Sequence, residues 1–240
     1  ENKALLKINK KFTIEYLIEN IKKSKYSSNI ILCTTTKDED DLIATLAEKH
    51  DIHLFRGSSK DKINRWFECS IKYDVDFFVN VDGDDLFFDY ELGDKILDEY
   101  ANYDFVDGHG YYIDIYGISK DGINKVNASK KTDDTEYIRT FFNNQNNISK
   151  IKLTDIDKKY TKSDVRMTLD YKEDLLFFKE VIANVKDLRF DNIIEFLNDN
   201  PEIKNINFHL DEAWKKNQLG YFKWNIKNML EMNLNILKKY

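Results

Sequence analysis

The sequence predicts an α/β protein built around a mostly parallel sheet with helices on both faces. Over the first two-thirds of the chain, short apolar runs alternate with amphipathic stretches of helical length. This alternation is typical of consecutive strand–helix–strand units. The 240 residues, 42% of them hydrophobic and 33% charged, suffice for one sizeable core with an appendage.

The individual elements follow from the spacing of apolar residues and from the residues at the segment ends. Helical spacing, in places preceded by acidic or Ser residues that favour a helix N-terminus, predicts helices at 12–25, 38–50, 58–73, 90–100, 134–145 and 190–203. Short apolar runs predict strands at 29–36, 52–55, 76–82, 103–108 and 110–119. Residues 165–185 are predicted to form a strand ending at Asp170 and then a long helix. Pro201 is expected to stop the helix that begins at Phe190.

The chain is expected to consist of an α/β domain over residues 1–205 and a helical extension over residues 206–240. Within the extension, Trp224 to Tyr240 is strongly amphipathic. Its apolar stripe is predicted to dock on the domain or on a second subunit, which leaves a homodimer open. The stripe consists of Ile226, Met229, Leu230, Leu234 and Leu237.

Charge and cysteine content exclude several classes of protein. The net charge is −6, with Lys and Arg spread along the chain, which argues against a nucleic-acid partner bound through a basic face. No apolar run approaches the ~20 residues of a membrane span, so a cytoplasmic location is expected. Cys33 and Cys69 lack metal-ligand spacing and are expected to be buried free thiols.

The strongest candidate site lies at the end of the predicted strand 76–82, in the sequence VNVDGDDLFFD. Ligands bind at the carboxyl ends of strands in such sheets, and here Asp82, Asp84 and Asp85 follow the strand around Gly83. Carboxylates in this position suit Mg²⁺ that also holds nucleotide phosphates. An acidic turn that caps the following helix is the alternative interpretation.

Two further segments are weaker candidates. Asp170 ends a predicted strand and could share a cation with the first site, although Asp170 followed by Glu173 also resembles a capping box. Arg56 and Ser58 lie where a predicted strand meets a helix N-terminus, a place that favours anions. Ordinary helix capping explains the serine equally well.

Taken together, these segments resemble the cytidylyltransferases that join CTP to acidic sugars. VNVDGDD resembles the VNVQGDEP motif of CMP-KDO and CMP-sialic acid synthetases, and residues 3–25 resemble their GKxLxxLxGKPLIEYTIExAKKS segment. The segment from FRGSSKDKINRWF to the GD motif, followed by VRMTLDYKEDL, is most similar to the spore-coat polysaccharide cytidylyltransferase-like branch. The likeness covers roughly residues 1 to 205.

The resemblance implies a GT-A-like, Rossmann-type three-layer fold and Mg²⁺-dependent transfer of CMP from CTP to a sugar acid or similar small anionic acceptor, for surface polysaccharide biosynthesis. Pyrophosphate would be released. By motif, Lys3 and Asp84 would be catalytic, and Asp84 and Asp170 would bind the metal. Nucleotide contacts would come from Arg56, Ser58 and Asp82, and the acceptor side would include Arg166, also a candidate for binding nucleotide, and residues 113–116.

The sequence departs from the family pattern in several places. The resemblance places the family's first strand and signature loop ahead of Glu1, the family's two prolines are replaced by Phe12 and Leu86, and the segment at 132–138 lacks the spore-coat branch's His. Two alternatives therefore remain. A GT-A glycosyltransferase would use the DxD formed by residues 82–84, and a non-catalytic relative would act as a binding or assembly subunit.

Overall fold

The computed structural model describes residues 3–155, 158–161, 164–214 and 216. Its strands are β1 (Lys7–Ile8), β2 (Lys11–Phe12), β3 (Ile31–Thr35), β4 (His53–Gly57), β5 (Phe77–Asn80), β6 (Phe105–Asp107), β7 (Tyr116–Ser119) and β8 (Lys150–Lys152). Its helices are α1 (Thr13–Ile21), α2 (Asp41–Lys49), α3 (Lys62–Lys72), α4 (Tyr90–Glu99), α5 (Lys120–Ser129), α6 (Ile138–Asn143), α7 (Lys172–Asn184), α8 (Phe190–Asp199) and α9 (Pro201–Phe208). The α/β class predicted from the sequence is confirmed.

The described strands form three sheets. β1 and β2 make an antiparallel hairpin, β3 and β4 pair in parallel, and the largest sheet has the order β5-β7-β6-β8. In that sheet β7 runs antiparallel to β5 and β6, whereas β6 and β8 are parallel. Within that sheet β5, β6 and β8 therefore run in the same direction and β7 runs against them. The expectation of one mostly parallel sheet is not confirmed, because the described strands fall into three sheets, one of them mixed. The connection from β6 to β7 is a short loop, and a parallel pair would need a crossover of a dozen or more residues.

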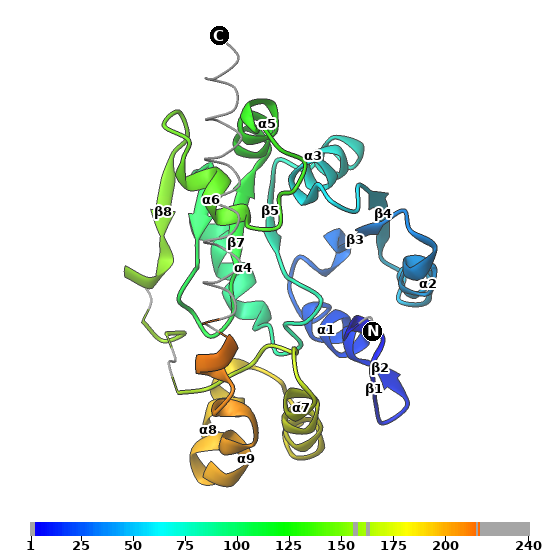
Figure 1. Cartoon of the computed structure of the whole chain (residues 1–240), viewed down its shortest axis with the longest axis vertical. Helices are drawn as coiled ribbons and strands as arrows, with labels where there is room; N and C mark the ends of the chain where they lie inside the picture. Colours follow the sequence, from blue (N-terminus) through cyan, green and yellow to red (C-terminus); the bar gives the residue numbers. More distant parts are fainter. Residues whose placement is uncertain (1–2, 156–157, 162–163, 215, 217–240) are drawn as a thin grey trace.

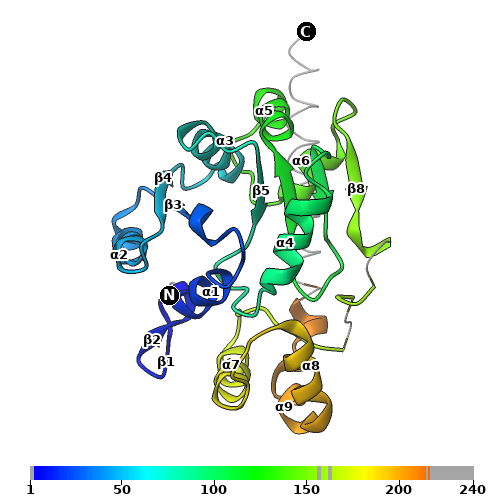
Figure 2. The same ribbon diagram turned by 180° about the vertical axis from the view of Figure 1, so that it is seen from behind.

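Helices cover both faces of the largest sheet (Figures 1 and 2). On one face, Val106 packs in a core cluster with Leu92 and Ile96 of α4. On the other, Phe105 packs with residues of α3, α5 and α6. Since successive side chains of a strand point to opposite faces, the two clusters account for the fully buried β6.

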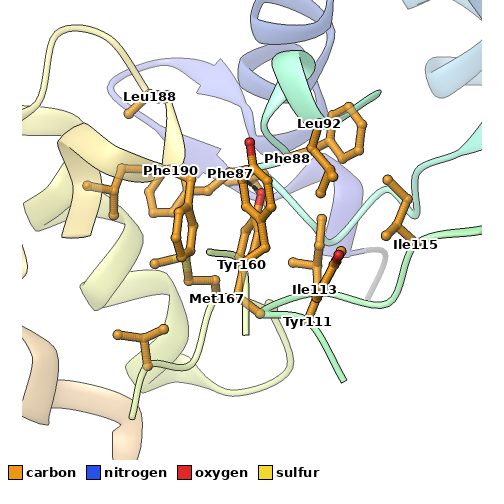
Figure 3. Close-up of a cluster of buried hydrophobic side chains, with 14 of the residues drawn as sticks. Phe87, Phe88, Leu92, Tyr111, Ile113, Ile115, Tyr160, Met167, Leu188 and Phe190 are labelled. Carbon is orange, nitrogen blue, oxygen red and sulfur yellow. Dashed lines mark hydrogen bonds between the residues drawn. The ribbon is translucent and has the colours of Figure 1, made fainter. Parts of the chain in front are cut away.

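The first cluster also joins the sheet to the carboxyl-terminal helices α7 and α8, which lie together at one end of the molecule (Figure 1). Figure 3 shows the aromatic rings of Tyr160 and Phe190 lying near Phe87 and Met167. The Tyr160 and Phe190 ring centroids are 5.2 Å apart. Packing of this kind fixes the segment around residues 165–170 against the end of β5.

Three local predictions differ from the structure. Residues 165–170, predicted as a strand, form neither a strand nor a helix in the structure. The single helix predicted over 190–203 is two helices: α8 ends at Asp199, before Pro201 as expected, and Pro201 then opens α9, because the N1 position tolerates proline. The helix α5 was not predicted. It is capped by Ser119, whose side chain accepts a hydrogen bond from the Gly122 N–H at 2.9 Å.

The predicted domain boundary at 205/206 falls within α9. The amphipathic segment 224–240 lies outside the described residues, so its docking stays a prediction. None of the helices in the described part of the chain combines the length and apolar character that crossing a membrane requires.

A buried carboxylate links α1 to α2 and should make stability depend on pH. Glu15 is 2% exposed and contacts Lys49, His50 at 2.9 Å and the Phe12 N–H at 2.9 Å. Burial alone raises the pKa of the Glu15 carboxyl, but the hydrogen bonds from Lys49, Phe12 and His50 outweigh it and lower the pKa to about 2.

Because this pKa is lowered in the folded state, Glu15 stabilises the fold above its unfolded pKa of about 4.3. That contribution is lost as the pH falls toward 2. Glu15→Gln is expected to lower the melting temperature at pH 7 and to flatten its decline between pH 4.5 and 2. Thermal melts of both proteins across that range test this, and parallel curves for the two would contradict it.

Candidate active site

Two carboxylates from distant parts of the chain converge on one lysine. The Lys3 Nζ donates to Asp84 Oδ2 at 3.1 Å and to Asp170 Oδ1 at 2.7 Å. Burial lowers the pKa of the Lys3 ammonium, but the hydrogen bonds and charges of Asp170 and Asp84 outweigh it and raise this pKa. Three residues predicted from the sequence are thus brought together.

The backbone fixes where these carboxylates lie. β5 ends at Asn80, and the chain then turns, with the Asp85 N–H donating to the Asp82 carbonyl at 3.0 Å. The Leu169 N–H donates to the Asp84 carbonyl at 3.2 Å. This backbone hydrogen bond places the segment ending at Asp170 beside the turn after β5, so the two candidate sites lie at one location.

A buried ion pair holds Asp170 in place. The guanidinium of Arg166, whose side chain is 1% exposed, donates to Asp170 Oδ2 at 2.7 Å and to both carboxylate oxygens of Asp174 at 2.9 and 3.0 Å. Asp174 also accepts the Asp170 and Tyr171 N–H groups, each at 2.8 Å. These contacts hold the Asp170 carboxylate against the Arg166 guanidinium, and the ligand contact that the resemblance implies for Arg166 stays a prediction.

A second lysine reaches the site from the start of α3. The Lys62 Nζ donates to Asp82 Oδ1 at 2.8 Å. Burial lowers the pKa of Lys62, but the charges of Asp82 and Glu136 outweigh it and raise this pKa. Lys62 was not among the residues predicted from the sequence. Its only signal was its place directly after Asp61, the residue that caps the helix.

Arg56 and Ser58 serve the local backbone in this structure. Arg56 donates to the Thr35 and Lys37 carbonyls, each at 2.8 Å, and pairs with Asp41 at 2.7 Å. The Ser58 hydroxyl accepts the Asp61 N–H at 3.0 Å, which stabilises the turn into α3. Neither side chain has a described hydrogen bond or ion pair with Asp82, Asp84 or Asp170.

The segment 113–116 is mainly core. Ile113, Ile115 and Tyr116 are 5%, 0% and 8% exposed, and the side chain of Asp114 between them reaches the surface, where it pairs with His109 Nδ1 at 2.9 Å. Asp85 is also buried. Burial first, then the charges of Asp84, Asp82 and Asp114, raise its pKa well above the usual range of an aspartate.

The donor set suits a magnesium ion that arrives with phosphates. No group of three or more His, Cys, Asp or Glu side chains that could hold a metal occurs in the described residues. The site instead offers the carboxylates of Asp84 and Asp170, which both pair with the Lys3 ammonium group. Mg²⁺ is usually bound by one or two carboxylates plus substrate phosphates and water, with no dedicated protein cage, so Asp84 and Asp170 fit it.

Comparison with known proteins shows the family of the chain. A family model described as cytidylyltransferase matches residues 1–189. An uncharacterized protein of Methanocaldococcus jannaschii is 32% identical over 219 residues, covering 86% of this chain and 88% of its own length. The spore coat polysaccharide biosynthesis protein SpsF of Bacillus subtilis is 21% identical over 204 residues, covering 79% and 84%.

A solved structure agrees in fold. The cytidylyltransferase of Leptospira borgpetersenii superposes with a TM-score of 0.76 at 22% identity, over 85% of this chain and 90% of that one. The two relatives and this structure each match between 79% and 86% of the chain.

Proposed function

Because the chain belongs to the cytidylyltransferase family, we propose that it transfers CMP from CTP to a sugar acid or a similar small anionic acceptor, with Mg²⁺ and with release of pyrophosphate. An acceptor oxygen attacks the α-phosphorus of CTP. The bond from that phosphorus to the β-phosphate oxygen breaks, and the acceptor hydroxyl gives its proton to solvent. The observation that carries the proposal is the convergence of Asp84 and Asp170 on the Lys3 ammonium.

The chain's own residues have distinct tasks in this proposal. Asp84 and Asp170 would hold the metal, which when bound neutralises triphosphate charge. Lys3 adds a second positive charge beside the same carboxylates, and Arg166 keeps Asp170 oriented from behind. Transfer of this kind depends on positioning and charge stabilisation more than on covalent help from the protein.

The similarity to SpsF supports an acceptor used in surface polysaccharide biosynthesis. The test is pyrophosphate release from CTP and Mg²⁺ with a panel of sugar acids, including 2-keto-3-deoxy acids, with detection of the CMP-linked product. We expect pyrophosphate and CMP-linked product in equal amounts with at least one acid. Hydrolysis of a nucleotide sugar, with no pyrophosphate from any acid, would instead support a glycosyltransferase.

Lys3→Met tests the role of the lysine. Loss of its ammonium beside the triphosphate is expected to weaken CTP binding about tenfold, equivalent to ~1.4 kcal/mol. Lys10→Met, at the exposed tip of the β1–β2 hairpin, is the control and should bind CTP as the parent chain does. Calorimetric titration of CTP with Mg²⁺ measures the CTP affinity of both variants. Equal affinity for the two variants would remove Lys3 from the binding site.

We propose a preference for CTP over UTP, ATP and GTP only because the chain belongs to the cytidylyltransferase family. The hydrogen bonds of Arg56 and Ser58 go to their own backbone surroundings in this structure, so neither is a strong candidate for reading the base. Titration of the four nucleotides with Mg²⁺ decides the preference. Tighter binding of a purine nucleotide would contradict it.

A further inference from the structure

A second group of charged side chains lies at the same edge of the largest sheet as the candidate active site. Asn80, at the end of β5, pairs with Tyr116 of β7, and Tyr116 also pairs with Asp107, at the end of β6. Because β5 and β6 run in the same direction, the loop that follows Asp107 leaves the sheet on the same side as the turn at residues 82–85.

One buried phenol, that of Tyr116, is close to both groups. Its pKa is raised, with burial as the largest cause, and the charges of Asp114, Asp107 and Asp82 add to that rise. The charge of Arg139 acts in the opposite direction. Salt screens charges beyond about 10 Å. Asp82 of the candidate active site and Arg139 therefore lie near the same side chain.

Asp107 holds two potentially cationic residues in place. Its side chain is 9% exposed. Its Oδ2 accepts a hydrogen bond from the Arg139 Nε at 2.8 Å, and its Oδ1 accepts one from the His109 backbone N–H at 3.0 Å. The His109 ring in turn pairs through Nδ1 with Asp114 Oδ1 at 2.9 Å. One buried carboxylate thus fixes Arg139, on α6, beside the loop that carries His109.

The loop that carries His109 is packed so that few of its side chains reach the surface. Within residues 105–118, the exposed positions are His109, Gly110 and Asp114. The apolar side chains of the loop, including Tyr111, lie in the core cluster of Figure 3. Gly110 has a φ of +100°, which glycine adopts without steric cost. The paired imidazole and carboxylate are therefore presented to solvent from a firmly packed loop.

Both residues keep hydrogen-bond donors for a ligand. The Arg139 side chain is 39% exposed, and within the described part of the chain its terminal nitrogens make no hydrogen bond. The His109 side chain is 50% exposed, and only its Nδ1 is paired there. The pKa of His109 is raised, with the hydrogen bond to Asp114 as the largest cause; burial and Arg139 oppose this, and the charge of Asp107 supports it.

We propose that Arg139 and His109 bind the carboxylate of the acceptor. The inference rests on the proposed function, because it takes the acceptor to be a sugar acid. The two terminal nitrogens of a guanidinium match the two oxygens of a carboxylate. Asp107 and Asp114 already offset most of the positive charge, so the pair suits a single carboxylate better than a phosphate dianion. An acceptor bound there would lie near Tyr116 and hence near Asp82.

The test compares 2-keto-3-deoxyoctonate and N-acetylneuraminate with their methyl esters, which lack the negative charge. Calorimetry with Mg²⁺ present measures their affinities for the parent chain, Arg139→Met and His109→Gln. Arg189→Met is the matched control, because Arg189 is 37% exposed and also donates its Nε to an aspartate at 2.8 Å. Melting temperatures report whether each variant is folded. If Arg139→Met does not fold, the exposed His109 still provides the test.

We expect at least one acid to bind the parent and Arg189→Met about tenfold or more tightly than its ester. Arg139→Met and His109→Gln should lose most of that difference. In an NMR titration of the parent, the acid should raise the pKa of the His109 ring and the ester should not, because a nearby anion favours the protonated form. A full acid–ester difference in either folded variant would overturn the proposal, as would the absence of any difference in the parent.

Failure of this inference can be distinguished from failure of the proposed function. Acid binding that requires Arg139 and His109, without pyrophosphate release from CTP, would keep the carboxylate site and remove the transferase reaction. Pyrophosphate release with an acid whose KM is unchanged in Arg139→Met would keep the reaction and remove the carboxylate site. A rise in KM for the acid, with KM for CTP unchanged, is the result expected if both are correct.

Discussion

Asp84→Asn is expected to reduce the rate of CMP transfer by about 10²–10³-fold, the range seen when one preorganised charge-stabilising group is removed. The fold should be retained. The pKa of the Asp84 carboxyl is raised. Burial is the largest cause, and the charges of Asp82 and Asp170 add to it, whereas Lys3 acts in the opposite direction. Because the charged form is already disfavoured by burial and by two like charges, removal of the charge should change the melting temperature little.

The matched control for this variant is Asp199→Asn, which removes an equivalent charge at the exposed end of α8. Steady-state rates with CTP, Mg²⁺ and the acceptor found in the pyrophosphate assay are compared for both. Activity of Asp84→Asn within about tenfold of the parent, only ~1.4 kcal/mol of barrier, would show that Asp84 does not hold the metal.

Arg166→Met is expected to destabilise the fold strongly. It leaves the carboxylate of Asp174, which is 0% exposed, without its charged partner. Breaking a buried pair in this way costs about 3–5 kcal/mol. At ~2–4 °C per kcal/mol for a domain of this size, the melting temperature should fall by roughly 10 °C.

The double variant Arg166→Met with Asp174→Asn should recover part of that loss. It removes the unpaired charge yet keeps an acceptor oxygen for the Asp170 and Tyr171 N–H groups. If Arg166 instead contacted the acceptor directly, Arg166→Met would melt normally and raise KM for the acceptor. That result would contradict the positioning role assigned to it.

Much of the fold could be predicted from local patterns. Apolar runs located β3 and β5 because both strands have helices packed on their two faces. The segment 165–170 was misjudged for a physical reason. Its alternating Val165, Met167 and Leu169 are buried, but burial on one side comes from packing on α7 and α8 and needs no strand ladder.

The helix α5 is the reverse case, an element that is present in the structure but was not predicted. Its sequence, KDGINKVNAS, holds residues of modest helix propensity, and burial of Ile123 and Val126 stabilises it through tertiary contacts. Such contacts cannot be read from spacing alone.

Part of the site could be predicted from the rule that ligands bind at the carboxyl ends of strands. Asp84 was predicted because it follows an apolar strand, and Asp170 because it ends a segment that was predicted to be a strand. Their meeting on Lys3 depends on how residues 165–170 pack against the turn after β5, a tertiary fact. Lys62 was missed because the start of α3 approaches Asp82 only in the folded chain. A buried arginine such as Arg166 looks the same in sequence whether it faces a ligand or a carboxylate.

The most direct test of a metal-assisted nucleotide site at Asp84 and Asp170 is a calorimetric titration of CTP, with Mg²⁺ and then with a chelator, into the parent chain and into Asp84→Asn and Asp170→Asn. We predict that the parent binds CTP at least about tenfold more tightly with Mg²⁺, a difference of ~1.4 kcal/mol, and that both variants lose this gain. Equal CTP affinity with and without Mg²⁺ in the parent, or a full Mg²⁺ gain in either variant, would contradict a metal-assisted site at these two carboxylates.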